Sequence, residues 1–124
     1  VYAELAGEVV SVERIANLAR AAAARLVRLG VDNVRVVVGD GTLGWAQLAP
    51  YDAIVVAAAG PHIPRALLEQ LRIGGRLVMP VGSETSQELM RVTRQAEGRY
   101  RHEYLGGVRF VPLIGEDGWD PRRL

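Results

Sequence analysis

One short apolar run constrains the fold most strongly. The segment Ala53-Ile-Val-Val-Ala-Ala-Ala-Gly60 is apolar at nearly every position. Its length suits a strand and falls far short of the ~20 apolar residues of a membrane span. A strand without polar alternation is covered on both faces, which is typical of a parallel sheet packed between helices. The run therefore predicts an open α/β sheet that contains a strand at Ala53–Ala58.

The hydrophobic pattern before this run predicts two strands and a helix. β-Branched residues indicate strands at Val9–Val12 and Val34–Val38. Between them, apolar residues at spacings of three and four predict a helix over Arg14–Leu29, which Gly30 ends. Val1–Glu8 has the pattern of a helix's last turn.

The pattern after the run changes from parallel to antiparallel character. Pro64 suits the first turn of a helix that extends through Leu71 and ends at Gly74-Gly75, and Arg76–Pro80 is a fourth strand. Alternating residues near Met90, then Tyr100–Leu105 and Val108–Leu113, predict strands with one wet face. The order predicts an α/β sheet with an antiparallel end, in a single domain over residues 1–124.

Composition excludes several classes of chemistry. The 124 residues carry a net charge of +1, all 15 basic residues are arginine, and there is no cysteine. A P-loop lysine, a Schiff-base lysine, a thiol nucleophile and a cysteine zinc site are therefore excluded. The absence of a basic block argues against nucleic acid as a partner, and the short apolar runs argue against a membrane partner.

Acidic residues follow the first two predicted strands. In open α/β sheets, ligands bind outside the carboxyl ends of the strands. Glu13 stands at the first such end and could accept hydrogen bonds from a ribose diol, or it could simply favour the start of the next helix. Asp40, between Gly39 and Gly41, could accept from an adenine amine, or it could belong to a tight Asp-Gly turn. The residues thus predict an adenosine-type ligand.

Other candidate residues are less specific. Ala57, Ala58 and Ala59 leave backbone groups open to a ligand, or they pack closely under a crossover. His62 could act as a general base, but neither His62 nor His102 has a partner at metal-ligand spacing, so no metal is expected. The Gly-rich turn that adenosine-type cofactor sites require does not precede Glu13.

A series of strings along the chain carries a family resemblance. They are Val10-Ser-Val-Glu-Arg-Ile15, Gly39-Asp-Gly-Thr-Leu-Gly44, Ala49-Pro-Tyr-Asp-Ala-Ile54, Pro61-His-Ile-Pro64, Leu68-Glu-Gln-Leu71, Gly74-Gly-Arg-Leu-Val78, Pro80-Val-Gly82 and Val108-Arg-Phe-Val-Pro-Leu113. This series resembles the protein-L-isoaspartate O-methyltransferases. The last string separates that family from other methyltransferases and from nicotinamide-dependent Rossmann enzymes.

The resemblance implies a Rossmann-like, S-adenosylmethionine-dependent methyltransferase. Such an enzyme is cytoplasmic and transfers a methyl group to L-isoaspartyl residues, and more weakly to D-aspartyl residues, of damaged proteins. By the resemblance, Glu13 would bind the ribose hydroxyls, Asp40 the adenine amine, and the Gly41 backbone would lie beside the ring. Two segments, Ala57–Ala59 and Arg109-Phe110-Val111, would flank the substrate peptide. No catalytic base is expected, because the substrate carboxylate is ionised at neutral pH and is its own nucleophile.

The resemblance also implies that part of the family's domain is missing from these residues. The family's first strand and its Gly-rich turn would lie before Val1, and this strand would stand between Val9–Val12 and Ala53–Ala58. We expect the two exposed edges either to pair directly or to cause self-association. We also expect the chain alone to be impaired as an enzyme. The alternative is a non-catalytic nucleoside-binding or interaction domain derived from the family.

Overall fold

A computed structural model describes residues 1–123 of the chain. The chain divides into two compact units, Val1–Gly41 and a second unit that begins at Thr42. Each unit is described by itself. The expectation of a single domain stays a prediction.

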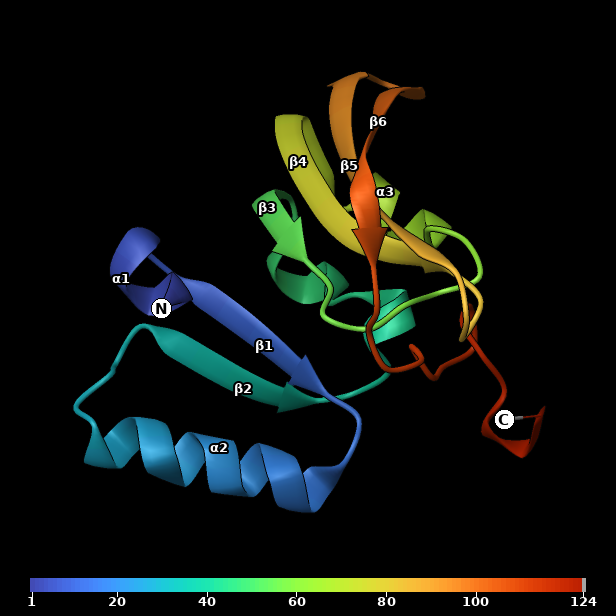
Figure 1. Cartoon of the computed structure of the whole chain (residues 1–124). Coiled ribbons are helices and arrows are strands. Elements are labelled where there is room, and N and C mark those ends of the chain that lie inside the picture. Colours follow the sequence, from blue (N-terminus) through green and yellow to red (C-terminus); the bar gives the residue numbers. More distant parts are fainter. Residues whose placement is uncertain (124) are drawn as a thin grey trace. The chain divides into compact units, whose positions relative to one another are not determined.

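The first unit is a parallel strand pair with a helix beside it. It comprises α1 (Tyr2–Leu5), β1 (Val9–Glu13), α2 (Ala16–Arg28) and β2 (Val34–Val38). Strands β1 and β2 run parallel, with Val9 opposite Val34 and Glu13 opposite Val38. Figure 1 shows α2 lying along this pair. Both predicted strands and the predicted helix are therefore confirmed.

Gly30 ends α2 for a conformational reason. Its φ of 72° lies in the left-handed region, which glycine adopts without steric cost. The apolar spacing predicts one helix face made of Ile15, Leu18, Ala22, Leu26 and Leu29. Ala22 and Leu26 are half-buried, whereas Ile15, Leu18 and Leu29 are exposed and Ala19 is the buried residue. A two-stranded sheet is narrow, so within this unit it covers only the central stripe of the helix.

The second unit holds a four-stranded mixed sheet. Its elements are the short 3₁₀ turns η1 (Gly41–Leu43, which starts at the last residue of the first unit), η2 (Ala46–Leu48) and η3 (Pro121–Arg123), the helix α3 (Arg65–Glu69), and the strands β3 (Tyr51–Val55), β4 (Leu71–Gly82), β5 (Gln87–Ala96) and β6 (Arg99–Val108). The strand order is β3-β4-β5-β6; β3 is parallel to β4, and the other pairings are antiparallel. Figure 1 shows β4, β5 and β6 as long neighbouring ribbons, with α3 beside them. The predicted antiparallel end of the sheet is confirmed.

The core of this unit lies between α3 and one face of the sheet. Leu67 of α3 packs with residues of β4 and β5 that are almost completely buried: Leu71, Leu77, Met79 and Val92. Removing a buried leucine from such a cluster costs roughly 2–5 kcal/mol. This packing fixes where the ends of β4 and β5 lie within the second unit.

Two predicted boundaries are wrong near β4. Strand β3 ends at Val55, not at Ala58, and Leu71 begins β4 instead of extending the helix. Gly74-Gly75 therefore lies within β4. A Cβ at Gly75 would lie 2.8 Å from the carbonyl oxygen of Arg72, so glycine serves close backbone approach there.

The predicted strand Val108–Leu113 is replaced by a single parallel bridge between Ala59 and Pro112. On the opposite side of this segment, the Gln87 side chain forms hydrogen bonds with the N–H and the carbonyl of Phe110. Pro112 has no N–H to donate to a further strand. The segment therefore cannot continue a regular ladder on that side.

The described strands form two separate ladders, β1-β2 and β3-β4-β5-β6. Direct pairing of the first strand with the Ala53–Ala58 run, one of the two outcomes expected, stays a prediction. Self-association, the other outcome, stays a prediction. No helix of residues 1–123 has both the length and the apolarity needed to cross a bilayer.

Candidate functional site

Glu13 and Asp40 lie at the same edge of the first unit. Glu13 is the last residue of β1 and stands opposite Val38, the last residue of β2. The N–H of Gly39 donates to the Glu13 carbonyl at 3.0 Å, and Asp40 and Gly41 follow directly. The carboxyl ends of two parallel strands thus bring Glu13, Asp40 and Gly41 together, as the sequence pattern predicted.

The Glu13 side chain is partly engaged. It is half-buried, and one carboxylate oxygen accepts the N–H of Ile15 at 3.2 Å. This bond is the local contact that a helix-start role would give. The second oxygen forms no hydrogen bond within residues 1–123, so the carboxylate keeps acceptor capacity for a diol.

The loop that follows Gly41 is held by side chains that sequence reasoning missed. The side-chain amide of Gln70 donates to the Leu43 carbonyl at 3.0 Å and accepts the Trp45 N–H at 2.9 Å. The Tyr51 hydroxyl donates to the Trp45 carbonyl. Burial raises the pKa of Tyr51, so this hydroxyl keeps its proton at neutral pH. Gly44 has a φ of 63° and faces the Gln70 amide.

On the second unit, Ala59 and Val111 are hydrogen-bonded to each other. The N–H of Ala59 donates to the Val111 carbonyl at 2.7 Å. The Ala59 carbonyl accepts from the Leu113 N–H at 2.8 Å and from the Trp119 indole N–H at 3.1 Å. Ala59 is 1% exposed. Two segments predicted to flank the substrate therefore meet, but the backbone groups of Ala59 are already satisfied.

The hydrogen bonds that join Ala59 to Val111 and Leu113 do not continue to the residues before Ala59. Ala57 is exposed and Ala58 is half-buried. Within residues 1–123, no hydrogen bond joins Ala57 to Arg109 or to Val111. The backbone groups of Ala57 and Ala58 are therefore better placed to meet a ligand than those of Ala59.

The Gln87 side chain forms hydrogen bonds with both backbone groups of Phe110. This buried side chain accepts the Phe110 N–H at 2.7 Å and donates to the Phe110 carbonyl at 3.0 Å. Of the predicted segment, Arg109 and Val111 are exposed and Phe110 is pinned through its backbone. No pattern in the sequence signals this contact, because Gln87 and Phe110 are 23 positions apart.

His62 has an acidic partner that the sequence did not suggest. Its Nε2 lies 2.5 Å from Oδ1 of Asp117, and both side chains are partly exposed. His102 is exposed on β6. Among residues 1–123, no group of three or more His, Cys, Asp or Glu side chains is arranged to hold a metal ion.

Comparison with known proteins gives consistent relatives. A family model described as "Protein-L-isoaspartate(D-aspartate) O-methyltransferase (PCMT)" matches residues 1–118. A protein-L-isoaspartate O-methyltransferase of Rhodopseudomonas palustris is 59% identical over 120 residues, covering 96% of this chain and 55% of that protein. One of Protochlamydia amoebophila is 54% identical over 120 residues, covering 96% and 57%. The chain thus spans about half the length of the curated relatives it matches.

Solved structures agree with the fold. A protein-L-isoaspartate O-methyltransferase superimposes with a TM-score of 0.81 at 30% identity, covering 90% of this chain and 35% of that chain. A second structure is a putative enzyme of that name from Plasmodium falciparum, described as a complex with S-adenosyl-L-homocysteine. It has a TM-score of 0.75 at 24% identity, covering 86% and 52%, and this likeness shows the fold alone.

The fold class predicted from sequence, an α/β sheet of the Rossmann-like methyltransferase type with antiparallel carboxyl-terminal strands, is confirmed by these structures. The family model covers nearly all of the chain, and the relatives align over almost its full length. This chain belongs to the protein-L-isoaspartate(D-aspartate) O-methyltransferase family.

Proposed function

We propose that this chain forms part of a cytoplasmic protein repair enzyme. The enzyme transfers a methyl group from S-adenosylmethionine to the carboxylate of L-isoaspartyl residues, and of D-aspartyl residues, in damaged proteins. The observation that carries the proposal is the meeting of Glu13, Asp40 and Gly41 at one sheet edge in a chain of this family. The complex with S-adenosyl-L-homocysteine described for the Plasmodium falciparum protein supports the same cofactor class.

The residues at this edge fit an adenosine group. Glu13 offers an acceptor oxygen to the ribose hydroxyls, which are donors. Asp40 offers a carboxylate to the adenine amine, and Gly41 has no side chain to keep the ring from the backbone. The space at Gly41 is open, since a Cβ there would meet no atom within 4 Å.

The proposed reaction needs little general acid or base catalysis. S-adenosylmethionine supplies a methyl group on a sulfonium, which is a good leaving group. The isoaspartyl carboxylate is ionised at neutral pH and attacks without a base. The residues of this chain therefore bind and align the reactants, and a well-aligned pair gains most of its rate from orientation. His62 contacts the Asp117 carboxylate, and the proposed reaction requires no base from this histidine.

The second unit supplies the proposed peptide side. The backbone groups of Ala57 and Ala58, and the exposed residues Arg109 and Val111, stand where the Ala59 pairing opens. An extended peptide needs backbone donors and acceptors of this kind. Phe110 and Ala59 would support the peptide side by packing, because their backbone groups are already bonded.

A methyl-transfer assay tests the proposal. The substrates are S-adenosylmethionine with an isoaspartyl peptide, and with the aspartyl peptide of the same sequence as control. The protein is expressed from its complete reading frame, beside the 124-residue chain. We expect transfer to the isoaspartyl peptide alone, and impaired transfer by the 124-residue chain, because no Gly-rich turn precedes Glu13. Cofactor binding without transfer would favour a non-catalytic nucleoside-binding domain instead.

We also propose that the 124-residue chain self-associates. Strands β1 and β3 each have a single partner within the described residues, so each leaves a strand edge unpaired there. Unpaired edges favour pairing with another chain. Gel filtration should show a species larger than a monomer, and a stable monomer at all concentrations would exclude association.

A further inference from the structure

Three consecutive residues near the carboxyl end contact separate parts of the second unit. We call Asp117-Gly118-Trp119 the clamp segment. The backbone N–H of Asp117 donates to the buried Thr42 hydroxyl at 3.1 Å. The Trp119 indole N–H donates to the Ala59 carbonyl at 3.1 Å. The segment thus touches the residue that follows Asp40-Gly41 and the last residue of the Ala57–Ala59 run.

The Asp117 carboxylate makes a third connection. Its Oδ1 lies 2.5 Å from His62 Nε2, and its Oδ2 accepts the backbone N–H of Arg65 at 3.3 Å. Arg65 is the first residue of α3, and His62 belongs to the loop that joins the Ala57–Ala59 run to this helix. One carboxylate therefore holds both ends of that loop against the clamp segment.

Gly118 lets the clamp segment approach closely. A Cβ at this position would lie 2.5 Å from the Leu113 carbonyl oxygen and 3.1 Å from the Thr42 methyl carbon. The Trp119 N–H also donates to the Leu113 carbonyl at 2.8 Å. The clamp segment is thus fixed against Thr42 and Leu113 by backbone contacts that do not involve the Asp117 carboxylate.

The backbone N–H and the side chain of Asp117 have separate roles. Its backbone N–H fixes the clamp segment to the loop that follows the proposed adenine-binding residues. Its side chain fixes the His62 loop, which follows the proposed peptide-binding residues. Alignment of methyl donor and acceptor is the main task proposed for this protein, and small misplacements are costly in rate.

We propose that Asp117 is a positioning residue for the peptide side of the methyl-transfer site. Its carboxylate holds the His62 loop, and through it the end of the Ala57–Ala59 run, at a set position relative to Thr42. This inference rests on the proposed function. It assigns a role to a residue outside the sets proposed above to bind cofactor and peptide.

The test compares three variants of the protein expressed from its complete reading frame. Asp117→Ala removes both carboxylate contacts but keeps the backbone N–H to Thr42. Asp117→Asn keeps one acceptor oxygen for the Arg65 N–H. Asp120→Asn is the matched control, because within residues 1–123 the Asp120 side chain bonds only to Arg122. The measurements are kcat and KM for an isoaspartyl peptide, the Kd of S-adenosyl-L-homocysteine, and Tm.

We expect Asp117→Ala to lower kcat/KM for the peptide about tenfold, the size expected for loss of one charge-assisted hydrogen bond. The Kd of S-adenosyl-L-homocysteine should stay within about twofold of the wild-type value, because the contact to Thr42 is kept. Asp117→Asn should recover part of the loss, and Asp120→Asn should match the wild type. A merely structural role would instead weaken cofactor binding and lower Tm in step with the rate.

The outcomes separate the two proposals. If the wild-type protein transfers no methyl group, the proposed function fails, and this inference fails with it. If the wild-type protein is active and Asp117→Ala behaves like Asp120→Asn, only this inference fails. If Asp117→Ala does not fold, Asp117→Asn decides, and unchanged peptide kinetics in that variant would overturn the inference.

Discussion

The side-chain amide of Gln87 pairs with both backbone groups of Phe110, at 2.7 Å and 3.0 Å. The pairing has the form of a strand bridge, but one partner is a side chain. It holds the Phe110 backbone at the point where β6 has ended and no ladder continues. Gln87 is 6% exposed, so the amide works in a setting where hydrogen bonds are costly to lose.

Replacing Gln87 by leucine should therefore destabilise the protein. Leucine keeps much of the volume but leaves the N–H and carbonyl of Phe110 without these partners. We expect a loss of about 2 kcal/mol in the free energy of unfolding, since each orphaned group costs roughly 1–3 kcal/mol when buried. Urea denaturation measures it. Glu88→Gln, at the exposed neighbouring position, is the control and should change little.

Gly44 should be less tolerant of alanine than another glycine with positive φ. Gly44 has a φ of 63° and Gly98 a φ of 68°, so alanine at either position would pay the left-handed penalty of about 1–2 kcal/mol. Only at Gly44 would the added Cβ overlap with the Gln70 amide; at Gly98 it meets nothing within 4 Å. Gly44→Ala should cost about 1 kcal/mol more than Gly98→Ala. Equal losses of stability in thermal unfolding of the two variants would show that the Gln70 side chain moves aside at no cost.

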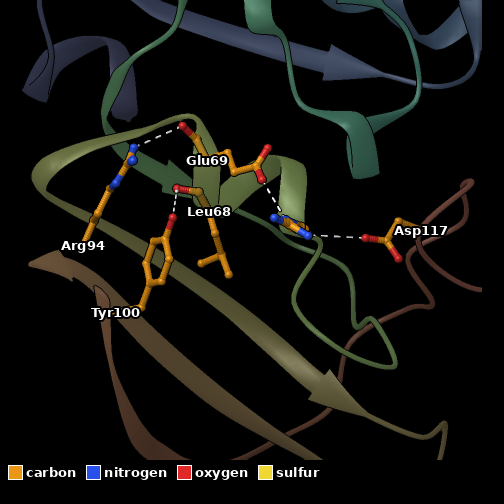
Figure 2. Close-up of polar contacts among 6 residues, drawn as sticks. Leu68, Glu69, Arg94, Tyr100 and Asp117 are labelled. Atoms are coloured by element: carbon orange, nitrogen blue, oxygen red, sulfur yellow. Dashed lines mark hydrogen bonds and ion pairs between the residues drawn. The ribbon is translucent and has the colours of Figure 1, made fainter. Parts of the chain in front are cut away.

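Arg94 of β5 should stabilise the end of α3. Its guanidinium donates to the carbonyls of Glu69 and Leu71, at 3.2 Å and 2.7 Å, and Figure 2 shows it beside Tyr100, whose hydroxyl donates to Leu68. The last carbonyls of a helix lack partners within the helix.

Arg94→Met should cost about 2 kcal/mol, because the Arg94 side chain is 11% exposed and the contact that it would lose at the Leu71 carbonyl is part-buried. Chemical denaturation against the wild type checks this value. The exposed Arg99, in the same hairpin, is the matched control as Arg99→Met. A loss no larger than that of the control would contradict the capping role.

The Arg91–Glu103 pair predicts a stability change at acid pH. The hydrogen bond from Arg91, aided by the charges of Arg91, Arg101 and Arg76, lowers the pKa of Glu103 below its ordinary value of 4.5. The folded protein then binds fewer protons at Glu103 than the unfolded chain does. The stabilisation is therefore complete above the ordinary pKa and is lost as pH falls through the lowered one.

Glu103→Gln should accordingly reduce stability at neutral pH and have less effect as pH drops below about 4. Thermal unfolding across pH 3 to 7 measures it, with Glu88→Gln as control. A constant difference between Glu103→Gln and the wild type at all pH values would contradict the assignment.

Local sequence patterns predicted much of the fold. The period of apolar residues identified β1, α2 and β2, and the Ala53–Gly60 run identified a strand beginning near β3. The sequence also indicated that Glu13 and Asp40 lie at one edge of the sheet, because the carboxyl ends of neighbouring parallel strands meet at the same edge.

Other features depend on tertiary contacts and could not be predicted locally. Leu71 fits a helical pattern, yet it pairs with Tyr51 as the first residue of β4. Gln70 bonds to residues 25 and 27 positions earlier, and Asp117 to Thr42, 75 positions away. A polar side chain gives no sign in the sequence of a distant backbone partner, so Gln70, Gln87 and Asp117 were missed.

The most direct test of the central claim is calorimetric titration of S-adenosyl-L-homocysteine into the protein expressed from its complete reading frame. The claim is that the edge formed by Glu13, Asp40 and Gly41 holds the adenosine part of the cofactor. We predict binding by the wild type, weakened about tenfold by Asp40→Ala, with the exposed Asp32→Asn as an unchanged control. Absence of binding by the wild type, or equal affinity for wild type and Asp40→Ala, would contradict it.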